Sequence, residues 1–138
     1  MTGPNEHRAR DGGTVGAAVS NAVVGLVRQY TGRGPTQART HISPDLVSVV
    51  MGDTLTQAER KLADDGKADL VLQIRHEFQQ TMRDDLVAAV ETITEREVIA
   101  FMSDNHIDPD MAVESFVLRP EAAADQPRRA LDAQPGQE

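Results

Sequence analysis

Apolar side chains recur every three or four residues in two long stretches of this chain, and that spacing predicts two amphipathic helices. The first stretch begins near Thr14 and ends before the sequence GRGP at 32–35, because glycine can adopt a left-handed helix stop and proline prevents continuation. The second, 68–94, carries one apolar stripe, formed by Val71, Ile74, Phe78, Met82, Leu86, Ala89 and Ile93. A helix of that length reaches about 40 Å, so we expect part of it to pack on a second chain.

Shorter patterns predict a third helix and two pairs of strands. The third helix lies within 54–66, where Thr56 and Glu59 have the spacing of a capping box. Four runs read as strands, at 37–42, 45–52, 96–103 and 111–120. The run 45–52 is apolar at nearly every position, which is typical of a strand covered on both faces.

The order of these elements is helix, two strands, two helices, two strands. Because the strands come in hairpin pairs rather than in alternation with helices, the pattern predicts an α+β fold with a mostly antiparallel sheet packed on helices. We expect one domain at 14–118. Residues 1–13 and 119–138 are polar or rich in Pro, Ala and Gln, so a disordered N-terminal segment and a flexible C-terminal tail are expected.

Composition narrows the possible partners. The net charge of −8 and pI of about 4.9 argue against nucleic acid and anionic membrane surfaces. The chain has no Cys, which excludes disulfides and thiolate sites and suits a cytoplasmic location. It also shows neither a signal-peptide pattern nor an apolar run of spanning length, so no direct membrane insertion is expected.

Charge is unevenly distributed along the chain. Residues 12–44 include arginines but no acid, whereas 104–114 contain four acids and no Lys or Arg. These segments either form ordinary solvated surface or meet each other, within the chain or across a dimer. The long helix, the aromatic-poor core and the exposed sheet edges favour a homo-oligomer, most simply a two-fold dimer.

The acidic segment has residue types that bind metals, namely Asp104, His106, Asp108 and Asp110. A calcium loop requires glycine at its sixth position, where this segment has Pro109, and one histidine with scattered acids is a weak zinc pattern. Asp, Asn and Pro are also turn formers, so a hairpin loop is favoured and no metal is predicted. His76, beside Arg75 and Glu77, is assigned to the polar side of the long helix.

Arg33, Arg39 and His41 are the candidates for a small-anion or partner contact, since side chains two apart on a strand share a face. The glycines around Arg33 follow a helix and precede a strand, which is the wrong order for a phosphate-binding loop. No nucleophile–base pair is apparent, so neither a catalytic residue nor a cofactor is predicted. A small-anion sensor or small enzyme using these three residues remains the alternative function.

The structural turn at 32–35 is formed by Gly32, Gly34 and Pro35 around Arg33. We expect Gly32 or Gly34 to adopt a positive φ, because a helix must stop and the chain must reverse within three residues. Arg33 should then project from a rigid turn. It serves either as a clamp on a carboxylate, with the acids of 104–110 as one target, or as a contact to a partner.

Three of these motifs together resemble a known family. They are GRGP at 32–35, the LT-x-x-E pattern at 55–59, and SDNHIDPD followed by FVL within 103–118. Over about 14–118 the chain is similar to the MpsC-like family of small bacterial proteins, named for the third component of a sodium-translocating membrane-potential-generating system. One local departure is Glu95-Arg96, where the resemblance implies a glycine.

That resemblance implies a function which the residues alone do not. It implies a soluble, cytoplasmic accessory or regulatory subunit that acts beside a membrane ion (sodium or inorganic-carbon) transport system. Its partner would be a protein, such as a membrane transporter component, and any location at the inner membrane would be peripheral. The resemblance brings no established catalytic residues.

Overall fold

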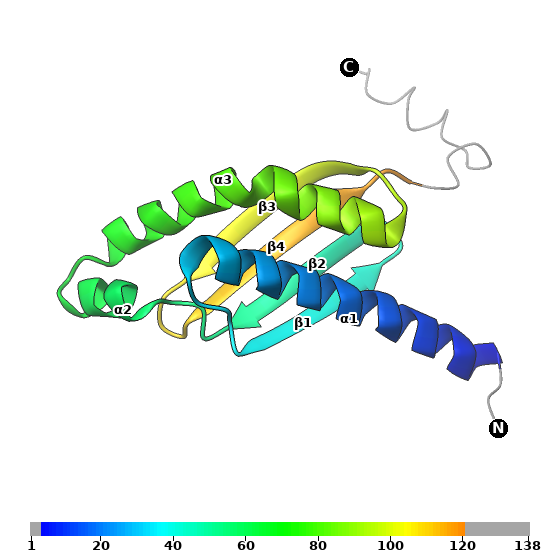
Figure 1. Ribbon diagram of the computed structural model, residues 1–138, viewed down its shortest axis with the longest axis horizontal. Helices are drawn as coiled ribbons and strands as arrows, with labels where there is room; N and C mark the ends of the chain where they lie inside the picture. The colour runs from blue at the N-terminus through cyan, green and yellow to red at the C-terminus, as the bar shows by residue number, and fades with distance from the viewer. Residues whose placement is uncertain (1–3, 121–138) are drawn as a thin grey trace, which may run out of the picture.

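The computed structural model describes residues 4–120, with side chains described from residue 13 onward. Helices and strands follow the predicted order (Figure 1), as α1 (Pro4–Thr31), β1 (Gln37–Ser43), β2 (Leu46–Gly52), α2 (Gln57–Asp64), α3 (Ala68–Thr94), β3 (Val98–His106) and β4 (Met111–Leu118). The four strands form one antiparallel sheet in the order β1-β2-β4-β3. The predicted α+β class with an antiparallel sheet packed on helices is therefore confirmed.

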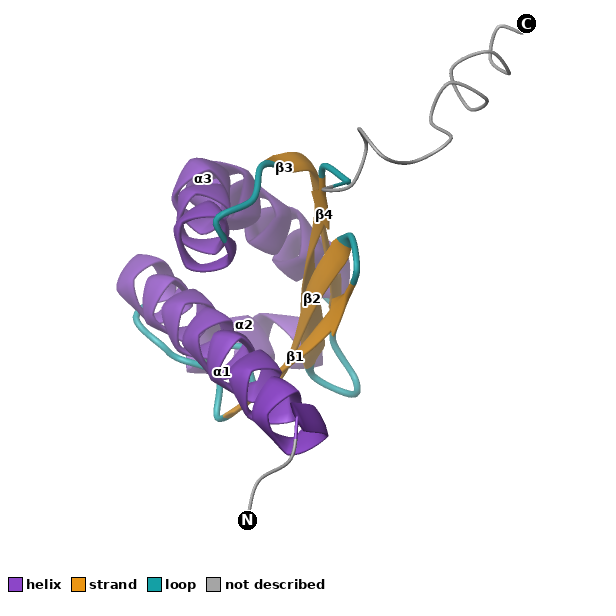
Figure 2. Ribbon diagram, turned by 90° about the vertical axis from the view of Figure 1, so that its right-hand side faces the viewer, coloured by secondary structure: helices purple, strands orange, loops and turns teal. Residues whose placement is uncertain are grey.

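The sheet has helices on one face only. Figure 2, which views the sheet nearly edge-on, shows α1 and α3 on the same side, with α2 near one end of the layer. No described helix covers the opposite face, which we call the outer face. The described chain thus forms two layers, helices and sheet, and exposes half of the sheet.

The core lies between the helices and the inner face of the sheet. It is almost entirely aliphatic, as the low aromatic content requires, and includes Val19, Val23, Val27, Val47, Val49, Met51, Met82, Leu86, Val90 and Leu118. Phe116 is the largest fully buried side chain, and its ring lies 5.2 Å from that of Phe101, measured between centroids. On the helical side of this core, α1 contributes its three valines, and α3 contributes Met82 and Leu86 of the predicted stripe together with Val90.

The prediction that 45–52 is covered on both faces is wrong for the described chain. Val47, Val49 and Met51 of β2 are buried under the helices, whereas Leu46 and Val50 on the outer face remain partly accessible. The strand is central in the sheet, which accounts for its apolar character on the inner side. Nothing in 4–120 accounts for it on the outer side.

Element ends follow local chemistry. Gly32 has φ +82° and its N–H bonds to Arg28 O at 2.8 Å, which confirms the predicted stop of α1. The capping box at Thr56 and Glu59 is present with both reciprocal hydrogen bonds. The α1 backbone is helical from Pro4, ten residues before the start that the apolar pattern indicates. The expectation of disorder for 1–3 and for the tail from 121 onward lies outside the described residues.

Candidate functional site

Arg33 projects from its turn onto a carboxylate, but the carboxylate is that of Asp53. Arg33 Nη2 lies 2.6 Å from Asp53 Oδ2. The same carboxylate accepts a hydrogen bond from Thr36 Oγ1 at 2.9 Å and contacts Arg60 Nη2 at 2.5 Å. The hydrogen bond from Thr36, followed by the contact with Arg33, lowers the pKa of Asp53. This geometry fits the clamp on a carboxylate that was expected of Arg33, with Asp53 as the carboxylate in place of the acids of 104–110, which were one possible target.

Asp110 is the one acid of 104–110 that joins this network. Its carboxylate accepts hydrogen bonds from Thr54 N and Thr54 Oγ1, both at 2.9 Å, and from Leu55 N at 3.1 Å. Arg60 Nη2 lies 2.9 Å from the same carboxylate and so links Asp110 to Asp53. These contacts hold the β3–β4 turn against the segment that leads into α2. Asp110 therefore has a structural role.

The structure does not gather Arg33, Arg39 and His41 into one site. Arg39 and His41 are exposed on the outer face of β1, whereas Arg33 is paired with Asp53 at the end of the sheet. An open groove of about 730 Å³ beside Arg39 is lined by Asp53 and Arg60, but by neither Arg33 nor His41. The geometry therefore adds no support for a three-cation anion site.

The remaining residues of the acidic segment also separate. β3 extends through His106, so Asp104 and His106 are strand residues on the outer face rather than members of a loop. His106 Nδ1 lies 2.8 Å from Pro109 O, and Asp108 precedes Pro109 in the turn. Within the part of the chain whose side chains are described, no group of three His, Asp or Glu side chains could hold a metal ion.

A buried polar cluster lies under the helices, and sequence reasoning missed it. Arg75 and Gln79 of α3 are buried, although Arg75 was assigned to the polar side of that helix together with the exposed His76. Arg75 Nη1 lies 3.0 Å from Glu59 Oε1. Gln79 exchanges two hydrogen bonds with Asn105, at 3.0 and 2.9 Å. A signal was available, because positions 75 and 79 continue the three- and four-residue spacing of Val71 and Met82.

Glu114, on β4, is the most deeply buried member of this cluster, with an exposed fraction of 1%. Burial raises its pKa to about 7, against the opposing effects of the neighbouring Ser103 hydroxyl, the Gln79 hydrogen bond and the Arg75 charge. Oε2 accepts from Gln79 Nε2 at 3.3 Å, and Oε1 has no hydrogen-bond partner among the described residues. The adjoining cavity is about 10 Å³, room for no more than a water molecule. The cavity is therefore too small to hold a substrate.

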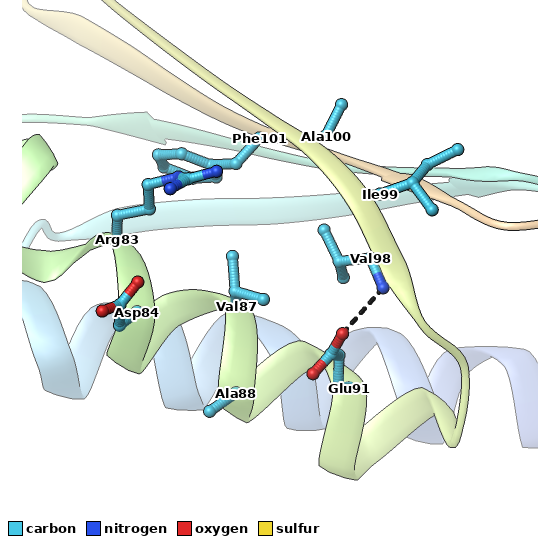
Figure 3. A pocket seen from close by; sticks show the side chains of 9 residues that line it. All are labelled: Arg83, Asp84, Val87, Ala88, Glu91, Val98, Ile99, Ala100 and Phe101. Atoms are coloured by element: carbon cyan, nitrogen blue, oxygen red, sulfur yellow. Dashed lines mark hydrogen bonds between the residues drawn. The ribbon is translucent and has the colours of Figure 1, made fainter.

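A groove lies between α3 and the free edge of β3 (Figure 3). Its volume is about 300 Å³, and its apolar lining comprises Val87, Ala88, Val98, Ile99, Ala100 and Phe101. Arg83 and Asp84 lie at one end of the groove and Glu91 at the other, as Figure 3 shows. Glu91 Oε2 accepts a hydrogen bond from Val98 N at 2.9 Å. Beyond Val98, β3 is an edge strand, and such a strand presents backbone groups that a further strand can pair with.

Comparison with known families decides the affiliation of the chain. Residues 12–120 match the family model described as "Na+-translocating membrane potential-generating system (MpsC)". The chain belongs to the MpsC family. The match spans the whole described sheet with α2, α3 and most of α1, so the fold described above is that of the MpsC region.

Two further findings concern this MpsC-family chain. Comparison with curated proteins and with solved structures finds no match. Among the described helices, none combines the length and the apolar character needed to cross a bilayer. The MpsC description points to a role in a sodium-translocating membrane-potential system.

Proposed function

We propose that this protein is a non-catalytic accessory subunit of a sodium-translocating membrane-potential-generating system, and that it acts by binding a protein subunit of that system. Membership of the MpsC family supports the system. The groove between α3 and β3 supports the mode of action, because it combines an apolar wall with a free strand edge. The cytoplasmic side of the membrane is the proposed place of action, in keeping with the absence of Cys.

The occupant that fits the groove is an extended segment of the partner subunit. Such a segment adds to an exposed strand edge through main-chain hydrogen bonds, while alternate side chains enter the adjoining pocket. Here the pocket would take apolar side chains beside Val87 and Phe101. Two acids and one arginine at the ends of the groove favour a segment with a basic residue near Glu91.

Ile99 provides the sharpest test of this groove. Its side chain is 45% exposed on the edge strand β3, so Ile99→Lys should leave the fold intact. We expect this variant to lose capture of membrane-system components from gently solubilised membranes of the native host, and to fail to restore sodium-dependent membrane potential in cells that lack the protein.

Ile42→Lys is the matched control, because Ile42 is the same residue type, is 46% exposed and lies on the other edge strand, β1. It should retain both activities. Equal behaviour of the two variants would exclude the groove as the contact. Wild-type protein that captures no component of a membrane transport system would contradict the proposed function itself.

A further inference from the structure

The outer face of the sheet is apolar where a solvent-facing sheet is expected to be polar. Its accessible apolar side chains come from β2, β4 and β3, and they include Leu46, Met102 and Met111, which are 37%, 54% and 41% exposed. Val50, Val113 and Val117 lie between them and are partly accessible. An antiparallel sheet with one solvated face normally alternates apolar and polar residues, so this face has the composition of a contact surface.

One row of residues across this face has a charged side chain at each end, on the two edge strands of the sheet. Strand register aligns Arg39 of β1 with Val50, Val50 with Val113, and Val113 with Asp104 of β3. The row therefore reads cation, apolar, apolar, anion. Arg39 and Asp104 are separated by three strand spacings, or about 14 Å, so they cannot pair within one chain.

This row is complementary to itself. A two-fold axis parallel to the strands, between β2 and β4, places β1 of one chain over β3 of the other. Arg39 then faces the partner's Asp104 at both edges, while Val50 faces the partner's Val113 in the centre. Stacked sheets lie about 10 Å apart and cross at about 30°. At that angle, β1 of one copy is displaced by about 4 Å from the β3 strand of the other copy that it faces. An arginine side chain is long enough to bridge this displacement.

On the two central strands, the same axis also brings similar side chains together in the neighbouring rows. Leu46 is aligned with Val117, so the axis stacks two apolar residues on each other. Ser48 and Ser115, whose hydroxyl oxygens are 3.2 Å apart, would meet the same pair of hydroxyls in the second copy. An axis perpendicular to the strands would instead stack β1 on β1 and bring Arg39 near the partner's His41. Charge thus selects the axis parallel to the strands.

We propose that two copies of this chain associate through the outer faces of their sheets, with Arg39 of each copy paired to the partner's Asp104. The contact covers the apolar outer side of β2, which no segment within 4–120 covers. It leaves the groove beside α3 open, so it is independent of the proposed function. Loss of groove binding and loss of dimerisation are separate outcomes in separate variants.

Charge reversal tests the pairing directly. Sedimentation velocity of the full chain at micromolar concentration should show a species of twice the 15.0 kDa chain mass. Arg39→Glu alone and Asp104→Arg alone should each be monomeric at the micromolar concentration where the wild-type chain is dimeric, because each creates two like-charge contacts. Lys61→Glu is the control: Lys61 is exposed on α2, in the helix layer and outside the groove.

Mixing the two single variants gives the decisive result. In a mixed dimer, the new carboxylate at position 39 of one chain faces the new guanidinium at position 104 of the other. The second edge keeps the native pair of Arg39 and Asp104. An equimolar mixture should therefore form heterodimers, although each variant alone is monomeric.

Circular dichroism of each variant checks that it is folded. Single variants that remain dimeric would overturn the proposal, and so would a mixture that remains monomeric. A wild-type chain that stays monomeric up to its highest soluble concentration would overturn it as well.

Discussion

At the scale of single residues, the most consequential side chain is Glu114. It lies on the central strand β4, accepts one hydrogen bond from Gln79, and is 1% exposed. Its pKa of about 7 means that the folded state resists ionisation of this carboxyl up to neutral pH. The polar cluster around it is therefore sensitive to pH in a range that cells reach.

Glu114→Gln should remove this sensitivity. In the unfolded chain the carboxyl ionises near pH 4.5, whereas in the folded chain it does so near 7. Wild-type stability is therefore unaffected by this group below pH 4.5 and falls as pH rises to about 7, by about 2–3 kcal/mol. The variant retains the hydrogen bond to Gln79 in an amide form and should not show this fall.

Urea unfolding at pH 5 and pH 8 measures the effect, as the difference in the free energy of unfolding between the two pH values. Glu77→Gln, on the exposed surface of α3, controls for the loss of one negative charge. If Glu114→Gln and wild type lose the same stability between pH 5 and pH 8, the carboxyl is ionised in the folded protein throughout.

At the scale of helices and strands, the helix ends are the features that local sequence determines most clearly. Gly32, the capping box of α2 and the bounds of α3 were all predictable, because each depends on residues close in the chain. Arg75 was wrongly assigned to the polar side of α3, because its burial depends on residues that are distant in the chain. Its burial depends on Glu59 and Asn105, which other elements bring to it, and periodicity alone does not reveal such partners.

Two glycines of the first helical region should respond in opposite ways to the same change. Gly25→Ala should stabilise the protein by about 0.5–1 kcal/mol, since alanine favours helix and a Cβ at this exposed position meets no atom within 4 Å. Gly32→Ala should destabilise it by about 1 kcal/mol, because Gly32 has φ +82°. Thermal and urea unfolding measure both. Two changes of the same sign would mean that the turn after α1 can rearrange.

At the C-terminus of α3, replacement of a residue by glycine should increase the stability of the fold. Glu95 caps the helix in the left-handed conformation, with φ 58°, at the position where a glycine was expected from the family resemblance. Its side chain is exposed, so Glu95→Gly should gain about 0.5–1 kcal/mol by relief of backbone strain. Glu95→Ala removes the same carboxylate but keeps the Cβ. Equal stability of these two variants, measured by urea unfolding, would show that the left-handed backbone carries no cost here.

At the scale of the whole molecule, sequence reasoning reached the fold class but not the sites. Element order and hairpin pairing follow from periodicity, and they suffice for an α+β layer structure. The partner of Arg33 could not be predicted, since Asp53 comes beside it only when the β1–β2 hairpin forms next to the end of α1. Arg39 was predicted as a candidate anion or partner contact and Asp104 as a member of the acidic segment, but the two were not predicted to act together. Strand order was needed to show that they lie at opposite edges of one face.

The strand order also bears on how the chain is made. β2 is complete at Gly52, but its second neighbour in the sheet, β4, begins only at Met111, so about 60 residues must be synthesised between them. At about 5–20 residues per second, this takes several seconds. During that interval, the edge of β2 that later pairs with β4 has no neighbouring strand. The nascent chain thus carries an aggregation-prone edge that only the last strand of the domain can close.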